Sequence, residues 1–148
     1  MKPILAIDYG DKRTGFAKSD ELLLIATPLE VFPTQPVDKL INHIIDLIAE
    51  YDIGLILLGV PYGTKTRITP QTEKVLKFEE ILEKKINIPI IEFDEVYSTK
   101  SAIDKIHQIG KKYHQIKNKI DSYAAATFLQ EFLDFHVNDQ IKDLLKEE

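Results

Sequence analysis

The chain has 148 residues, a length that fits one domain with a hydrophobic core of its own. No apolar run approaches the roughly 20 residues of a membrane-spanning helix, and the apolar start is too short for a signal peptide. Cysteine is absent, which excludes disulfides, a thiolate nucleophile and a zinc-thiolate site. We therefore expect a cytoplasmic protein that forms a single domain over residues 1–148.

The net charge of −5 argues at first against a nucleic-acid partner. The excess of acids is concentrated near the C-terminus, however. Residues 131–148 contain six acids and two lysines, a net of −4, so that the preceding residues sum to −1. We expect an acidic C-terminal tail over about residues 135–148, and the overall charge does not exclude nucleic acid.

The first part of the chain predicts three consecutive strands. Residues 3–8 predict a strand buried on both faces, because residues 3–7 are all apolar before Asp8. Residues 14–20 follow after the turn Gly10–Arg13 as the second arm of a hairpin. Residues 22–32 predict a third strand, with Pro28 near an edge or an end.

Helices and strands then alternate. The predicted elements are a helix over 37–52, a buried strand over 53–61, a helix from about 71 to 85, a strand over 88–95, a helix that begins near Ser98 or Thr99, a helix over 120–135 and a short acidic helix. This order predicts an α/β protein with a mixed five-stranded sheet. Three strands would be antiparallel and two parallel, with helices on both faces.

Acids lie at three places where elements of this fold end or begin. Asp8 ends the first strand, Asp94 and Glu95 end the last one, and Asp121 opens a helix. Ligands of open α/β sheets bind outside the carboxyl ends of the strands, and clustered carboxylates suit hard divalent cations. Two such ions can assist phosphodiester cleavage. Taken singly, these residues are more often turn formers or helix caps.

A second interpretation of the first turn is a phosphate site. The segment "DYGDKRTG" is similar to the Asp-x-Gly turn that actin-like ATPases place on a phosphate and its metal. Such enzymes need a second lobe to enclose the nucleotide, and 148 residues are too few for one.

Basic loops offer contacts for a nucleic-acid backbone. One polar loop, residues 62–70, contains Lys65 and Arg67. A second loop, residues 110–119, contains Lys111, Lys112, Lys117 and Lys119.

Four ordered motifs make the chain resemble the YqgF/RuvX family. They are "ILAIDYGDKRTGFAKSD", "LLGVPYGTKTRITPQTEKVLKF", "IPIIEFDEVYST" and "NKIDSYAAATFLQEFLD". The resemblance covers almost the whole chain and implies an RNase H-like fold. It also implies that Asp8, Glu95 and Asp121 are catalytic carboxylates that hold one or two Mg²⁺ or Mn²⁺ ions, and it adds Lys12 and Arg13 of the first turn to the candidate nucleic-acid contacts.

The activity that the resemblance implies is metal-dependent phosphodiester hydrolysis in 5′-end processing of pre-16S rRNA, with ribosomal precursor particles as partners. Resolution of four-way DNA junctions is the first alternative and requires a homodimer, whereas RNA processing also suits a monomer. A non-catalytic module for nucleic-acid binding or ribosome assembly is the second alternative.

Some residues depart from the family's pattern. Val96 stands where the family has Arg after Asp-Glu, Asp11 replaces a small residue in the first turn, and the central loop lacks the usual Asn-Met-Asp-Gly pattern. All three acids are nevertheless present.

Overall fold

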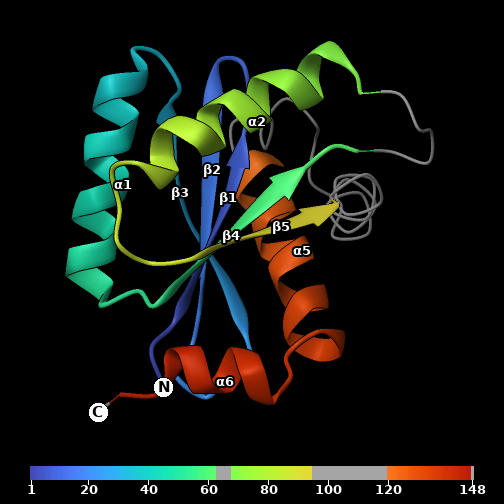
Figure 1. Cartoon of the computed structure of the whole chain (residues 1–148). Coiled ribbons are helices and arrows are strands. Elements are labelled where there is room, and N and C mark those ends of the chain that lie inside the picture. The colour runs from blue at the N-terminus through green and yellow to red at the C-terminus, as the bar shows by residue number, and fades with distance from the viewer. Residues whose placement is uncertain (63–67, 95–119, 148) are drawn as a thin grey trace.

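The computed structural model describes residues 1–62, 68–94 and 120–147. In these ranges a five-stranded mixed sheet has the strand order β3-β2-β1-β4-β5 (Figure 1). The strands are β1 (Ile4–Tyr9), β2 (Arg13–Ser19), β3 (Ala26–Pro33), β4 (Leu55–Val60) and β5 (Ile90–Asp94).

The central strand is β1, and all six of its residues are buried. It pairs antiparallel with β2 and parallel with β4, which in turn pairs parallel with β5. Its apolar side chains serve two cores, because successive residues of a strand point to opposite faces. The predicted sheet of three antiparallel and two parallel strands is confirmed.

The third strand begins later than the sequence predicts, at Ala26 instead of residue 22. The Asp20 carboxylate accepts hydrogen bonds from the backbone N–H groups of Leu24 (2.7 Å) and Ile25 (3.0 Å), and Leu23 has a left-handed φ of 59°. The apolar segment before Ala26 is therefore held as a loop by a side chain. As expected for a strand that contains Pro28, β3 lies at one edge of the sheet.

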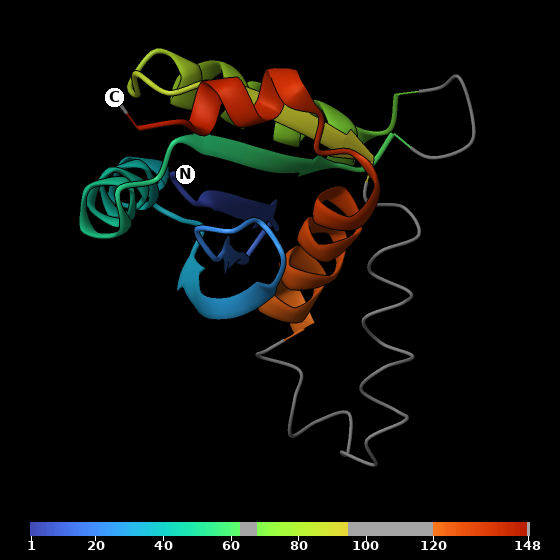
Figure 2. The same cartoon turned by 90° about the horizontal axis from the view of Figure 1, so that it is seen from below.

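Helices cover both faces of the sheet, as predicted. On one face lie α1 (Val37–Tyr51) and α2 (Pro70–Glu83), and on the other lies α5 (Ile120–Phe135). Figure 2 shows α1 and α5 on opposite sides of β1. The short helix α6 (Asp139–Leu145) completes the second core with Ile141 and Leu145. None of the helices in the described ranges is long and apolar enough to cross a bilayer.

The bounds of α5 match the predicted helix over 120–135. Ala124 and Ala125 are fully buried, and the helix packs against β1, β2 and β3. Small side chains let a helix approach a sheet closely. The helix expected from Ser98 or Thr99 and the basic loop 110–119 lie outside the described residues.

Candidate active site

Asp8 lies near the carboxyl end of the central strand and points toward α5. Ile4 and Ala6 belong to the core beneath α5, whereas Leu5, Ile7 and Tyr9 belong to the core beneath α1 and α2. The alternation of side chains along β1 therefore places Asp8 on the α5 face. Its side chain is only 8% exposed, so this carboxylate is held at a defined position instead of moving in solvent.

Both sheet neighbours of Asp8 are glycines. On β2, Gly15 is directly opposite Asp8. On β4, Leu58 is opposite Ile7, and because the two strands are parallel, the next residue, Gly59, lies beside Asp8. Residues opposite one another on neighbouring strands present their side chains to the same face. The Asp8 carboxylate is therefore flanked by positions without side chains, which suits a carboxylate that has to contact a ligand.

The N-terminal end of α5 lies toward the same end of β1. Three contacts connect Gln130 of α5 to the first residue of β1. The Gln130 side chain accepts a hydrogen bond from Ala26 N–H (2.9 Å), and Ala26 of β3 pairs with Ser19 of β2. The Ser19 hydroxyl in turn accepts a hydrogen bond from Ile4 N–H (2.7 Å). Gln130 thus marks the amino end of β1, and the start of the helix lies toward the opposite end (Figure 1).

The lengths of the two elements agree with this placement. From Asp121 to Gln130 an α-helix rises about 13.5 Å, and from Ile4 to Asp8 a strand rises about 13 Å. The backbone of Asp121 is therefore at about the level of Asp8, on the face toward which Asp8 points. The structure describes Asp121 through its position in α5 alone.

Of the two acids after "IPIIEF", the structure describes Asp94 alone. Ile90 packs in the core beneath α1 and α2, and Ile91 and Phe93 pack beneath α5. By alternation, Asp94 lies on the face opposite to Asp8 and is exposed. Of the two acids, Asp94 is thus not placed to join Asp8. Glu95 is the next residue along the chain and lies outside the described residues.

The fully buried residue Thr34 holds the turn after Asp8 in place through hydrogen bonds. The Thr34 hydroxyl donates to the Gly10 carbonyl (2.6 Å) and also contacts the Thr14 hydroxyl (2.8 Å), while Thr34 N–H donates to the Lys12 carbonyl (3.0 Å). Gly10 is required here because a Cβ at this position would lie 2.4 Å from the Arg13 carbonyl oxygen. The turn therefore presents Lys12 and Arg13 on a fixed backbone.

The other predicted basic contacts, Lys65, Arg67, Lys111, Lys112, Lys117 and Lys119, lie outside the described residues. Within the described ranges, no three or more His, Cys, Asp or Glu side chains form a group that could hold a metal ion. Of the three carboxylates predicted for that role, only the Asp8 side chain falls in those ranges. Its chemistry fits such an ion, because a carboxylate oxygen is a ligand that hard divalent cations prefer.

A carboxylate pair that the sequence analysis missed lies on the α2 face. Glu79 of α2 shares a hydrogen bond with Glu92 of β5, and Glu92 accepts another from the Tyr62 hydroxyl. Burial, followed by the hydrogen bond and charge of Glu92, raises the pKa of Glu79 to about 8. The hydrogen bond to Glu92 and burial raise the pKa of Tyr62 to about 12. Only the packing of α2 on β5 brings these residues together, so no local sequence signal marks them.

The strand order, with an aspartate near the carboxyl end of its central strand, places the protein among the RNase H-like folds. The structure is similar to Thermus thermophilus RuvC in complex with a Holliday junction substrate, with a TM-score of 0.56 and 16% identity over 90% of this chain and 94% of that one. The fowlpox virus Holliday junction resolvase gives a TM-score of 0.51 and 16% identity over 88% of this chain and 98% of that one. At these identities the likeness concerns the fold.

The sequence defines a narrower group. The RuvX family, described as Holliday junction resolvase, matches residues 2–135, and the chain belongs to this family. Proteins named "Putative pre-16S rRNA nuclease" are similar to it. One from Rickettsia rickettsii is 36% identical over 89% of this chain and 86% of that protein, and one from Desulforamulus reducens is 38% identical over 88% and 96%. These are names of nucleases, so the protein's class is nuclease, a hydrolase.

Proposed function

We propose that this protein is a metal-dependent nuclease that hydrolyses phosphodiester bonds in the 5′-end processing of pre-16S rRNA. The observation that carries the proposal is the setting of Asp8. It is a buried carboxylate near the carboxyl end of the central strand, flanked by two glycines, on the face where α5 begins. The membership of the RuvX family supports the same activity.

Three carboxylates have named roles in the proposal. Asp8, Glu95 and Asp121 would hold one or two Mg²⁺ or Mn²⁺ ions, and their oxygens are the ligand type that such ions prefer. When bound, the ions supply Lewis-acid stabilisation of the phosphate and a more acidic water. The buried β1 backbone keeps the Asp8 carboxylate in one orientation, and the glycines leave no side chain on either flank. The products would carry a 5′-phosphate and a 3′-hydroxyl.

Basic residues would hold the nucleic-acid backbone beside these acids. Lys12 and Arg13 start from the turn that directly follows β1, so the proposal places them beside the scissile phosphate. The basic residues of the two long loops, Lys65, Arg67, Lys111, Lys112, Lys117 and Lys119, would extend the contact along the strand. Counterion release would make this binding weaken as salt increases.

The names of the curated relatives favour RNA over DNA, because they give pre-16S rRNA as the substrate. The proposal places this activity in the cytoplasm, on ribosomal precursor particles. The second candidate is a four-way DNA junction, which the family's description favours. Junction resolution requires two cuts and hence a homodimer, whereas RNA processing also suits a monomer.

A cleavage assay tests the proposal and chooses between the substrates. The wild type and Asp8→Asn are each incubated with a 5′-extended rRNA precursor or with a four-way DNA junction, in the presence of Mg²⁺, Mn²⁺ or EDTA. We expect metal-dependent cutting of the precursor by the wild type and none by Asp8→Asn. The melting temperature of the variant should equal or exceed that of the wild type, because the substitution removes repulsion between carboxylates.

Asp46→Asn is the control, because Asp46 is an exposed acid of α1, which covers the face of the sheet opposite to Asp8. It should cut like the wild type. Cutting by a cleanly purified Asp8→Asn sample would refute the assignment. RNA binding without any cutting would favour the non-catalytic module, and Val96→Arg would then test whether the missing arginine accounts for the lost activity.

A further inference from the structure

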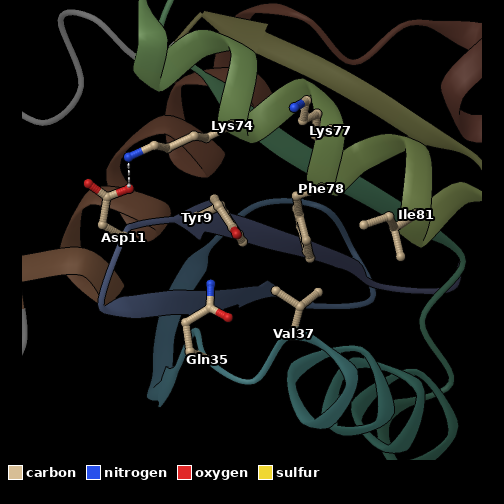
Figure 3. Close-up of a pocket in the computed structure, with 8 residues that line it drawn as sticks. All are labelled: Tyr9, Asp11, Gln35, Val37, Lys74, Lys77, Phe78 and Ile81. Carbon is tan, nitrogen blue, oxygen red and sulfur yellow. Dashed lines mark hydrogen bonds and ion pairs between the residues drawn. The ribbon is translucent and has the colours of Figure 1, made fainter.

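A cavity of about 460 Å³ lies on the side of β1 opposite to Asp8, and the proposed catalytic carboxylates do not use it (Figure 3). Three segments form it: the end of β1 with the turn that follows, the loop that leads into α1, and one side of α2. The volume falls in the range of about 300–1,000 Å³ that is usual for small-molecule sites.

The inner part of the cavity is flat and apolar. The rings of Tyr9 and Phe78 stack with their centroids 4.3 Å apart and their planes at 19°. Figure 3 shows Ile81 on the side of Phe78 that faces away from Tyr9, and Val37 across from Phe78 at the start of α1. Both rings are buried, at 8% and 2% exposed, so the pair forms an apolar floor, and a flat ring would lie on this floor between Val37 and Ile81.

Two polar groups open into this apolar space. Gln35 contributes an amide, which both donates and accepts hydrogen bonds. Tyr9 contributes a hydroxyl whose pKa is raised by burial and by the nearby Asp11 carboxylate, so that it stays a neutral donor. Groups of this kind can read the hydrogen-bonding edge of an uncharged ring.

The rim of the cavity is positively charged. Lys74 and Lys77 project from α2, and Lys74 forms an ion pair with Asp11 (3.2 Å). Both partners of this pair are more than half exposed, at 56% and 58%, and such pairs contribute little stability. A phosphate can therefore compete with Asp11 for Lys74, and Lys77 adds a second cation.

We propose that this cavity binds one unpaired base of the nucleic-acid substrate, while Lys74 and Lys77 hold the phosphates that flank it. The proposal rests on the proposed function, because the ligand is part of the strand that Asp8 would help to cut. Asp8 and Tyr9 are consecutive residues that face opposite sides of the sheet, so a strand that crosses the end of β1 meets both. An apolar side chain of a protein partner would fit the walls but would not use the two lysines.

The test removes bases from the ligand and fills the cavity in the protein. Single-stranded RNA oligonucleotides with one abasic position each are bound to the wild-type protein in EDTA, where cutting does not interfere. At one or two adjacent positions, loss of the base should weaken binding by about 5- to 100-fold, because the apolar surface that the base covers in the cavity returns to water. Ile81→Trp fills the cavity and should bind the intact and abasic oligonucleotides equally weakly.

Two matched variants control for surface effects. Ile45→Trp changes an isoleucine of similar exposure (39% against 43%) on α1, away from this cavity, and should keep the wild-type abasic pattern. Lys74→Gln combined with Lys77→Gln should make the slope of log K against log salt shallower by about 1.4, which is about 0.7 per lost phosphate contact. Lys84 directly follows α2 and does not line the cavity, so Lys84→Gln should leave the slope unchanged within experimental error.

A scan in which no position matters, or in which Ile81→Trp keeps the wild-type pattern, would overturn the proposal. So would saturation of the cavity by AMP or UMP with the affinity of the oligonucleotide, because the ligand would then be a free nucleotide. If no abasic position weakens binding but the wild type cuts RNA and Asp8→Asn does not, the nuclease proposal is supported and the base site is refuted. If one or two abasic positions weaken binding but the protein does not cut RNA, the base site is supported and the nuclease proposal is refuted.

Discussion

At the scale of single residues, we expect the activity of the Asp8 carboxylate to depend on the absence of side chains on its two sheet neighbours. Gly15 and Gly59 have no side chains beside the carboxylate, and both are buried. A methyl group at either position would point to the α5 face and occupy space next to the carboxylate. We expect Gly15→Ala and Gly59→Ala each to lower the cleavage rate at least tenfold, measured under single-turnover conditions.

The same variants should stay folded. Overpacking a tight site costs about 1–3 kcal/mol, and in a chain of this length each kcal/mol lowers the melting temperature by about 2–4 °C. Thermal unfolding of both variants checks this. Wild-type cleavage by both would mean that the glycines are not needed beside Asp8.

Glu79 predicts how stability changes with pH. Its pKa is about 8 in the folded protein against 4.5 for an ordinary glutamate, so the folded state holds a proton that the unfolded state releases. The contribution of Glu79 is therefore complete below about pH 4.5 and is lost as the pH rises to about 8. Because solvent screens this partly exposed carboxyl, we expect Glu79→Gln to gain about 1 kcal/mol at pH 8.5 and nothing at pH 4.

Urea unfolding at the two pH values measures the difference. Glu80→Gln is the control, because Glu80 is exposed and is paired with Lys84 (3.9 Å). A pH profile of Glu79→Gln that runs parallel to the wild type would exclude Glu79 as the cause.

At the scale of elements, Thr34 fixes the turn between β1 and β2. Thr34→Val would remove the hydroxyl that bonds to Gly10 and Thr14, and a buried polar group left without its partner costs about 1–3 kcal/mol. The turn carries Lys12 and Arg13, so substrate binding should weaken together with stability. Melting temperature and RNA affinity check both effects, and Thr34→Ser, which keeps the hydroxyl, should retain more of each.

The sequence predicts the elements whose signals are local. The bounds of α5 follow from its apolar spacing, and β1 follows from an uninterrupted apolar run that only a central strand can bury on both faces. The order of strands and helices then determines the mixed sheet. Asp8 could be singled out because the end of a central strand is a position shared by sites of many α/β proteins.

Features that depend on tertiary contacts escape such an analysis. The start of β3 is mispredicted because the Asp20 carboxylate holds residues with high strand propensity in a loop. The Glu79–Glu92 pair and the cavity beside Tyr9 each join segments that are distant in the sequence. The predicted catalytic roles of Asp8, Glu95 and Asp121 stay predictions.

At the scale of the whole molecule, α6 closes the core at the end of the sheet opposite to Asp8. Leu145 is fully buried, and its carbonyl accepts a hydrogen bond from Lys2 N–H (2.7 Å). Its neighbour Leu144 is 53% exposed. We expect Leu145→Ala to lower the free energy of unfolding by about 2–5 kcal/mol, while Leu144→Ala changes it by at most about 0.5 kcal/mol.

Denaturant unfolding measures both values, and the cleavage rate per folded molecule should be the same for the two variants because α6 lies far from the carboxyl ends of the strands. An equal loss of stability in both variants would show that α6 does not contribute through the buried face.

The position of α5 in the chain has a consequence for a molecule that is still being synthesised. The face toward which Asp8 points is covered by residues 120–135, whereas the strands beneath that helix come from the first 33 residues. On a ribosome that adds about 5–20 residues per second, that face stays open for several seconds after β1 and β2 have emerged. A nascent chain therefore has an exposed apolar sheet surface and an incomplete acid cluster. The proposed nuclease becomes competent to cut RNA only when translation has passed residue 135, the end of α5.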